Sequence, residues 1–398
     1  MKKIRFNSSA FLLLFSLFLI GSCSKKDQVL TPSSQDNQLI EKSASVNTGY
    51  TVFAPDVVFP RGLKFGPDGY LYVALAGVGG TNSTLGQCTQ VVAPVGPYLG
   101  GSTASIVKIS PKGIVSTVVE NLPSDITANG FPSGVADVVF VETQLYALVV
   151  AGCSHGNADY PSSIIKVNQK TGKWHVVADL SAYFLTHKVA VPEPDDFEPD
   201  GTPYSLVYVK GDFYVIEPNH GELIKVTRNG KVTRVLDFSA HFGHIVPTAM
   251  AFKGNFFVGN LTPFPLIGGA ASIYKVTSGG AVRIWATGFT GVLGVAFDKE
   301  DRMYVLETSV PGDPAGPPIF PQTGRVIRIN ENNTRDVIVD KLNFPTAIAF
   351  DHEGALYISN SGFGPPTGQI LKVAIKYHKD DKHDGHDGDN DHDGRSDN

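Results

Sequence analysis

Short runs of apolar residues fill the middle of the chain, and turn residues separate them. Segments such as LYVAL, FYVIE and LYISN are rich in Val, Ile, Tyr and Phe, and Gly, Asn or Asp residues stand between one run and the next. Strands of this kind, joined by tight turns, are typical of antiparallel meanders. The pattern therefore predicts an all-β fold.

The runs recur as a unit of four strands. The clearest copies of the first strand lie at residues 60–65, 203–208, 247–252 and 345–350, and two looser copies begin at Val135 and Val292. The second position of this motif falls at residues 61, 136, 204, 248, 293 and 346. Apart from two insertions early in the chain, this spacing is close to the roughly 40 to 50 residues of a propeller blade. Six copies predict a six-bladed β-propeller.

The sixth unit lacks a fourth strand before the C-terminal segment begins. Residues 50–58 (YTVFAPDVV) form a strand-like run that has no partner within the repeat. We expect this N-terminal strand to pair with the last blade and close the ring, which leaves no open sheet edge. The alternative is an open solenoid or two domains of three blades each.

Composition narrows the class of protein. The chain has 398 residues, 42% of them apolar, with 42 Gly and 26 Pro, which fits a turn-rich β protein with a large core. A net charge of −5 without a basic stripe excludes a nucleic-acid partner. Three Cys exclude a disulfide-dense scaffold.

The N-terminus resembles a lipoprotein signal. Residues 1–22 combine a basic start with an apolar run that is too short to span a bilayer, and small residues precede Cys23 as in a bacterial lipobox. We expect a lipid on Cys23, a membrane anchor and a flexible tether over residues 23–48. Ser24 favours the outer membrane as the destination. Ordinary signal cleavage beside an incidental Cys is the alternative.

The propeller is expected to span residues 49–376, and an Asp- and His-rich tail follows at 377–398. Within the tail, Asp389, Asp391 and Asp393 match the first half of a calcium loop, which then stops before its last acidic ligand. The tail is either a weak cation site or a disordered, solvated segment.

Several motifs resemble one known family. The stretches PRGLKFGPDGYLYVA, NLTPFPLIGGAASIYKV and FPTAIAFDHEGALYISNSGFGPPTGQILKV are similar to those of the ScyD/ScyE family, exported propeller proteins named from a scytonemin biosynthesis cluster. The resemblance covers about residues 50 to 375, and NHL and SMP-30-type blades share its GPDG and LYV elements. It implies a propeller fold and an export route, and it implies no particular reaction.

Propeller topology gathers chosen side chains at one mouth of the central channel, because first strands begin on the face where second strands end. The first-strand positions are Arg61, Ala136, Tyr204, Thr248, Leu293 and Thr346, and the second-strand ends are Leu75, Val149, Glu217, Asn260, Glu307 and Asn360. The polar members of both sets are our candidate ligand-binding residues: Arg61, Tyr204, Glu217, Thr248, Asn260, Glu307, Thr346 and Asn360.

Four of these candidates are hard oxygen donors. Glu217, Asn260, Glu307 and Asn360 occupy the same position in four blades and could hold a calcium ion. Side chains of this type at strand ends also commonly accept hydrogen bonds from the backbone of the next turn. The sequence leaves both possibilities open.

Two further candidates are charged or titratable. Arg61 could bind an anionic ligand, or it could pair with Glu217 or Glu307 and hold the channel shut. His220 is a weak candidate for a general base, because imidazole titrates near neutral pH, although a lone histidine on a loop is more often simply solvated. The other histidines lack HxH or HExxH spacing and do not support a zinc site.

Long loops are expected to cover the same mouth. They join the second and third strands at residues 76–104, 262–270 and 308–323. Cys88 and Cys153 lie in such loops of adjacent blades, and in an oxidising compartment we expect a Cys88–Cys153 disulfide, with two free buried thiols as the alternative. The protein is expected to be a monomer.

Two functions remain open at this point. The first is a lipid-anchored protein of the ScyD/ScyE type that binds a small molecule or a partner at the mouth without turnover. The alternative is a calcium-assisted hydrolase or lactonase of the SMP-30-like type. The Asn-Gly pair and the Asp that such enzymes share are absent from the matching positions, so their site residues do not carry over.

Overall fold

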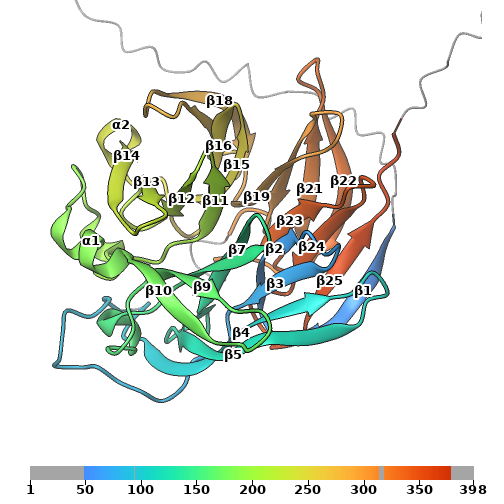
Figure 1. Ribbon diagram of the computed structural model, residues 1–398. Coiled ribbons are helices and arrows are strands. Elements are labelled where there is room, and N and C mark those ends of the chain that lie inside the picture. Colours follow the sequence, from blue (N-terminus) through green and yellow to red (C-terminus); the bar gives the residue numbers. More distant parts are fainter. Residues whose placement is uncertain (1–48, 94, 313–317, 378–398) are drawn as a thin grey trace, which may run out of the picture. The chain divides into compact units, whose positions relative to one another are not determined.

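The computed structural model describes residues 49–93, 95–312 and 318–377. The described chain is almost entirely β and forms six antiparallel sheets around a central axis, as Figure 1 shows. The prediction of a six-bladed β-propeller is therefore confirmed. In each blade the first strand lines the central channel, and the other strands of the sheet follow in the order in which they pair.

Blades 1 to 3 occupy the first part of the repeat. Blade 1 contains β2 (Pro60–Phe65), β3 (Leu71–Leu75), β4 (Leu99–Ile109), β5 (Val115–Ile126) and the short β6 (Pro132–Ser133). Blade 2 contains β7 (Val135–Val141), β8 (Gln144–Val149), β9 (Ser163–Val167) and β10 (Trp174–Asp179). Blade 3 contains β11 (Ser205–Val209), β12 (Asp212–Glu217), β13 (Glu222–Thr227) and β14 (Val232–Asp237).

Blades 4 to 6 complete the ring. Blade 4 contains β15 (Pro247–Lys253), β16 (Asn255–Asn260), β17 (Ala271–Val276) and β18 (Val282–Phe289). Blade 5 contains β19 (Val292–Phe297), β20 (Met303–Glu307), β21 (Gly324–Ile329) and β22 (Arg335–Leu342). Blade 6 contains β23 (Ala347–Phe350), β24 (Leu356–Asn360), β25 (Gly368–Val373) and, from the other end of the repeat, β1 (Tyr50–Val57).

The N-terminal strand closes the ring as expected. β1 pairs antiparallel with β25, with Tyr50 opposite Val373 and Val57 opposite Gly368, and Figure 1 shows the two strands side by side. The innermost strands add a second connection, because the Thr346 hydroxyl donates a hydrogen bond of 2.6 Å to the carbonyl oxygen of Pro60. The open solenoid and the two-domain arrangement are therefore wrong.

The core lies between neighbouring blades rather than inside one of them. One cluster joins Ile106 of blade 1 to Ala147 and Ile165 of blade 2, and another joins Ile273 of blade 4 to Val305 of blade 5. Second strands have apolar neighbours on both faces, and every residue of β3, β20 and β24 is buried. This explains why LYVAL, MYVLE and LYISN are nearly continuous apolar runs instead of alternating ones. Each fully buried aliphatic side chain stabilises the fold by roughly 1.5 to 3 kcal/mol.

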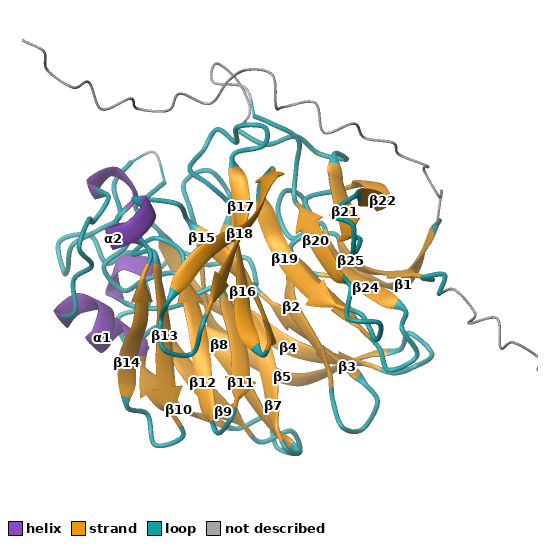
Figure 2. Cartoon of the chain, turned by 90° about the horizontal axis from the view of Figure 1, so that it is seen from above, coloured by secondary structure: helices purple, strands orange, loops and turns teal. Residues whose placement is uncertain are grey.

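Two insertions interrupt the repeat. The first is the segment 76–98 of blade 1, which ends earlier than expected because β4 begins at Leu99 and extends its hairpin with β5. The second lies between blades 2 and 3 and contains α1 (Leu180–Thr186) and the 3-10 turn η2 (Pro194–Asp196). Figure 2 shows α1 close to α2 (Ser239–Phe242) at one edge of the ring. Backbone amides of Ala190 and Val191 tie this connector to the side chains of Asp237 and Ser239.

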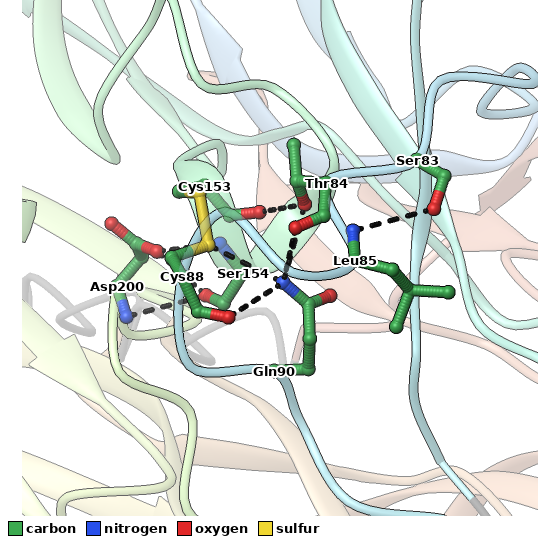
Figure 3. The surroundings of a disulfide bond; sticks show 8 residues. All are labelled: Ser83, Thr84, Leu85, Cys88, Gln90, Cys153, Ser154 and Asp200. Carbon is green, nitrogen blue, oxygen red and sulfur yellow. Dashed lines mark hydrogen bonds between the residues drawn. A yellow bond between two sulfur atoms is a disulfide. The ribbon is translucent and has the colours of Figure 1, made fainter.

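The predicted disulfide is present. Cys88 in the blade 1 insertion is bonded to Cys153, which opens the 3-10 turn η1 (Cys153–His155) in blade 2, with Cα atoms 6.2 Å apart. Figure 3 shows the surrounding bonds: the Thr84 hydroxyl donates to the Cys153 carbonyl oxygen, and the backbone and side chain of Ser154 both donate to Asp200. The disulfide region therefore connects both insertions.

The proposed targeting and tail segments lie outside the described residues. These include the signal region, Cys23 and its tether, and Asp389, Asp391 and Asp393 of the tail. Within the described ranges, no helix is long and apolar enough to cross a membrane.

Candidate functional site

A cavity of about 840 Å³ lies at the mouth of the channel. Its base is formed by starts of the innermost strands, including Arg61, Ala136 and Tyr204. Its walls come from the predicted loops of blades 1, 4 and 5, which contribute residues such as Tyr98, Phe264 and Ile319. The prediction that long loops surround one mouth is therefore confirmed. We call this space the mouth cavity.

Tyr204 separates the mouth cavity from the rest of the channel. It lines both the mouth cavity and a second space of about 350 Å³ between the inner strands. Its hydroxyl donates a hydrogen bond of 2.9 Å to the carbonyl oxygen of Thr346, which joins blade 3 to the opposite blade 6. Burial raises the pKa of Tyr204 to about 12, so the phenol keeps its proton near neutral pH. Tyr204 therefore forms part of the floor of the mouth cavity.

Arg61 lies at this floor. Its side chain donates to the carbonyl oxygen of Pro132, and its guanidinium carbon is 4.5 Å from the centroid of the Phe363 ring. Burial lowers the pKa of Arg61, while the neighbouring Tyr204 and Asp125 act in the opposite direction. Pairing with Glu217 or Glu307 is not what the structure shows, because those carboxylates bond elsewhere.

The four predicted oxygen donors share one structural position and one kind of bond. Glu217 accepts from the backbone amides of Thr202 and His220, at 2.8 and 2.6 Å. Asn260 accepts from the backbone amide of Ser272 and Glu307 from that of Thr290, both at 2.7 Å. Asn360 accepts from the backbone amide of Asn343 at 2.9 Å. Asn260 also donates to the carbonyl oxygen of Ile245, and Glu307 pairs with Arg325. In blades 3, 5 and 6 these bonds connect the end of the second strand to the segment that precedes the first strand, and in blade 4 one of them reaches the third strand.

This bonding bears on the calcium prediction. Glu217, Asn260, Glu307 and Asn360 do not line the mouth cavity, and their neighbours Asn219, Leu261, Thr262 and Thr308 do. No group of three or more His, Cys, Asp or Glu side chains that could hold a metal occurs in the described part of the chain. A calcium ion at the mouth stays a prediction, without support from the positions of these side chains.

The two candidate threonines connect blades. The Thr248 hydroxyl donates 2.6 Å to the carbonyl oxygen of Val292, which joins blade 4 to blade 5, and Thr346 joins blade 6 to blade 1 in the same way. Thr248 lines the mouth cavity. Thr346 does not line it, but its carbonyl oxygen accepts the hydrogen bond from Tyr204, which does. Both threonine hydroxyls are therefore used within the ring.

His220 lies in the protein interior behind the cavity wall. Its Nε2 is 2.8 Å from the carbonyl oxygen of Glu198, its ring stacks on Phe197 at 5.0 Å, and its Nδ1 is 3.8 Å from a carboxylate oxygen of Glu222. The side chain is buried and does not line the mouth cavity. Its role as a general base stays a prediction that these contacts do not favour.

A buried charged cluster in the wall is missing from the sequence prediction. His155 of η1 has its Nδ1 3.0 Å from Asp125 and its Nε2 3.6 Å from Glu198, and its ring stacks on Tyr98 at 4.9 Å. Burial alone would lower the pKa of His155, but Asp125, Glu198 and Asp200 together raise it to about 9. The imidazole is therefore protonated at neutral pH. We call these five residues the His155 cluster.

The His155 cluster holds the wall of the mouth cavity in place. Tyr98 and Glu198 line the cavity and are hydrogen-bonded at 2.5 Å, and they come from the two separate insertions. Gly152 makes the close packing possible, since its φ is 120° and a Cβ there would lie 2.2 Å from the Asp200 carboxyl carbon. The acidic run at residues 193–200 was the one signal in the sequence, and nothing indicated its partner His155.

Comparisons with known proteins support the fold and nothing finer. A scan against protein-family models finds no match, and neither does a search of curated proteins. A structural genomics protein of unknown function from Bacteroides thetaiotaomicron has a TM-score of 0.53 at 10% identity, over 82% of this chain and 72% of that one. The similarity at this identity concerns the fold alone.

Two further structures have lower scores. A putative oxidoreductase (glucose dehydrogenase) from Thermus thermophilus has a TM-score of 0.49 at 15% identity, over 82% of this chain and 99% of that one. A putative gluconolactonase has a TM-score of 0.49 at 10% identity, over 83% and 94%. Membership of the ScyD/ScyE family stays a prediction. By its own geometry, the chain is a six-bladed β-propeller.

Proposed function

We propose that this protein binds a small molecule in the mouth cavity and does not transform it. The observation that carries the proposal is a cavity of about 840 Å³ with a floor, set in a closed ring. Ligand sites commonly measure about 300 to 1,000 Å³, are mostly apolar and contain a few polar groups. The mouth cavity has this character, with Phe131, Val135 and Phe264 among many apolar residues and Arg61 among few charged ones.

The cavity wall is also preorganised. The Cys88–Cys153 disulfide and the His155 cluster connect the two insertions that carry Tyr98 and Glu198. A binding site that is ordered before the ligand arrives loses less conformational entropy on binding. This favours specific binding of a small molecule over loose contact with a partner surface.

Binding can be tested with an apolar fluorescent probe, N-phenyl-1-naphthylamine. We expect saturable binding with a stoichiometry of one, and weaker binding in Leu261→Trp, because half-buried Leu261 lines the cavity and an indole ring would occupy part of it. The matched control is Ile267→Trp on the same blade 4 loop, which is exposed and does not line the cavity. Equal binding by both variants would contradict the proposal.

The proposed setting is the outer membrane, with a ScyD/ScyE-type lipoprotein anchored through Cys23. The disulfide supports an exported location, because such bonds persist mainly in oxidising compartments. Labelling cells with a radioactive fatty acid tests the anchor: the wild-type chain should take up label and fractionate with membranes, and Cys23→Ala should do neither. Label retained by the variant would refute the anchor and leave the binding proposal intact.

A further inference from the structure

Arg61 is a buried cation without an ion-pair partner in the described part of the chain. Its side chain is 7% exposed, and no carboxylate oxygen of the described residues lies within the 4.0 Å of an ion pair from its nitrogens. Its five N–H groups have two described acceptors, the Pro132 carbonyl oxygen and the Tyr204 hydroxyl. Donors therefore remain for a ligand at the cavity floor.

This arrangement is energetically costly without an anion. The effective penalty for removing an ion from water is several kcal/mol, and a guanidinium does not escape it by losing its proton. The cation–π contact with the Phe363 ring offsets a small part of this penalty. An oxyanion that enters the cavity would offset much more of the penalty, since a guanidinium binds oxyanions with two parallel hydrogen bonds.

Nearby carboxylates do not already supply that anion. Asp125 is the carboxylate that acts on Arg61, and it lies 3.0 Å from the imidazole of His155 instead. Glu198 is bonded to Tyr98 and also faces His155. At the rim, Glu193 is half-buried and Asp195 is exposed. Solvent and salt screen the exposed Asp195 strongly, whereas the Arg61 guanidinium is buried at the floor.

The space above Arg61 is apolar and aromatic. Phe363 makes an edge contact with Phe131, their centroids being 5.4 Å apart, and both rings line the mouth cavity. Val135 and Leu293 add aliphatic surface beside them. A ligand that fits this space needs an apolar body to replace water there and one charged end to meet the guanidinium.

We propose that the ligand of the mouth cavity is a small amphipathic anion, with an aromatic or aliphatic body held against Phe131 and Phe363 and a single oxyanion group bound by Arg61. This inference rests on the proposed function and adds the chemical class of the ligand. Arg61 acts as the group that selects for charge, while the apolar wall supplies most of the contact.

Two probes that differ by one charged group test this inference. 8-Anilinonaphthalene-1-sulfonate has the same ring system as N-phenyl-1-naphthylamine and carries a sulfonate in addition. We expect the wild-type protein to bind the sulfonate probe at least about tenfold more tightly, the range of a hydrogen bond to a charged group. In Arg61→Met this preference should disappear while the neutral probe binds as before, and Arg61→Lys should keep part of it.

The possible outcomes separate the two proposals. Equal affinity of both probes for the wild-type protein, or a preference that survives in Arg61→Met, overturns the inference. Cavity binding stays intact in that case if Leu261→Trp weakens the binding of both probes. Binding of neither probe by the wild-type protein overturns both proposals. The comparison of the two probes on the wild-type protein tests the inference even if Arg61→Met folds poorly.

Discussion

In blades 3 to 6, a polar side chain at the end of the second strand bonds to backbone next to that strand. Glu217 illustrates this, because its two oxygens accept backbone amides from both neighbouring segments, Thr202 before the blade and His220 after β12. A buried amide that loses its acceptor costs roughly 1 to 3 kcal/mol. These residues are thus structural groups with a repeated role.

The bonds of Glu217 lead to a stability prediction. We expect Glu217→Ala to lower the free energy of unfolding by about 2 to 5 kcal/mol, because several buried amides lose their acceptor together. Glu217→Gln, which keeps one acceptor oxygen, should lose less than half as much. Urea denaturation of the two variants measures the difference. Equal losses would show that the charge rather than the acceptor matters.

His155 gives stability a pH dependence. Its pKa is raised from 6.5 to about 9 by Asp125 and its acidic neighbours against the effect of burial. The folded state therefore binds the proton more tightly than the unfolded state, so this contribution is complete below about pH 6.5 and is lost as the pH rises through about 9. The melting temperature of His155→Gln should fall furthest below that of the wild type near pH 6. The gap should narrow towards about pH 10, and a gap that stays constant would contradict the assignment.

Residue placement was predictable where the repeat applies and unpredictable elsewhere. Arg61 and Tyr204 could be assigned to the channel mouth because every blade has the same first strand. Their partners lie outside the repeated strands, Pro132 in the extra strand β6 and Phe363 in the loop between β24 and β25, so no periodic pattern indicates them. Likewise, Asp125 of β5 and His155 of η1 are 30 residues apart in adjacent blades, and no periodic pattern indicates their contact.

At the scale of elements, the insertions build the site and the strands support it. The sequence indicated the loops of blades 1, 4 and 5, because the spacing between second and third strands is long there. It did not indicate that the connector between blades 2 and 3 also reaches the mouth, where Glu198 lines the cavity. Connector length does not reveal the side on which a connector packs, since that depends on tertiary bonds such as those of Asp200 with Ser154.

The disulfide is the element-scale feature that can be removed cleanly. Cys88 and Cys153 are 65 residues apart, and in the chain-entropy model a crosslink of that span contributes up to about 4 kcal/mol. The double variant Cys88→Ser, Cys153→Ser should unfold at lower urea and bind N-phenyl-1-naphthylamine more weakly. Its far-UV circular dichroism should match the wild type, because the blades do not depend on this bond. Unchanged probe affinity would indicate that the His155 cluster alone holds the wall.

At the scale of the whole molecule, closure by β1 makes a single ring out of six sheets. β1 covers the outer edge of β25, and its buried residues Ala54 and Val57 pack between blades 6 and 1. Directly after β1, Pro60 accepts the hydrogen bond from Thr346, and the next residue is Arg61 at the cavity floor. Closure and the geometry of the binding site are therefore linked through a few consecutive residues.

Ala54→Asp tests this link. Ala54 is fully buried, and a carboxylate there would lack a partner, so β1 should detach from β25 and the melting temperature should fall by about 10 °C or more. Thr51→Asp places the same charge on an exposed position of the same strand and should change stability by no more than about 0.5 kcal/mol. The exposed edge of β25 should also promote dimers, which light scattering after size exclusion detects. Arg61 at the cavity floor follows shortly after β1, so Ala54→Asp should weaken probe binding even below its melting temperature. A variant that keeps both its stability and its probe binding would show that β1 is dispensable for closure.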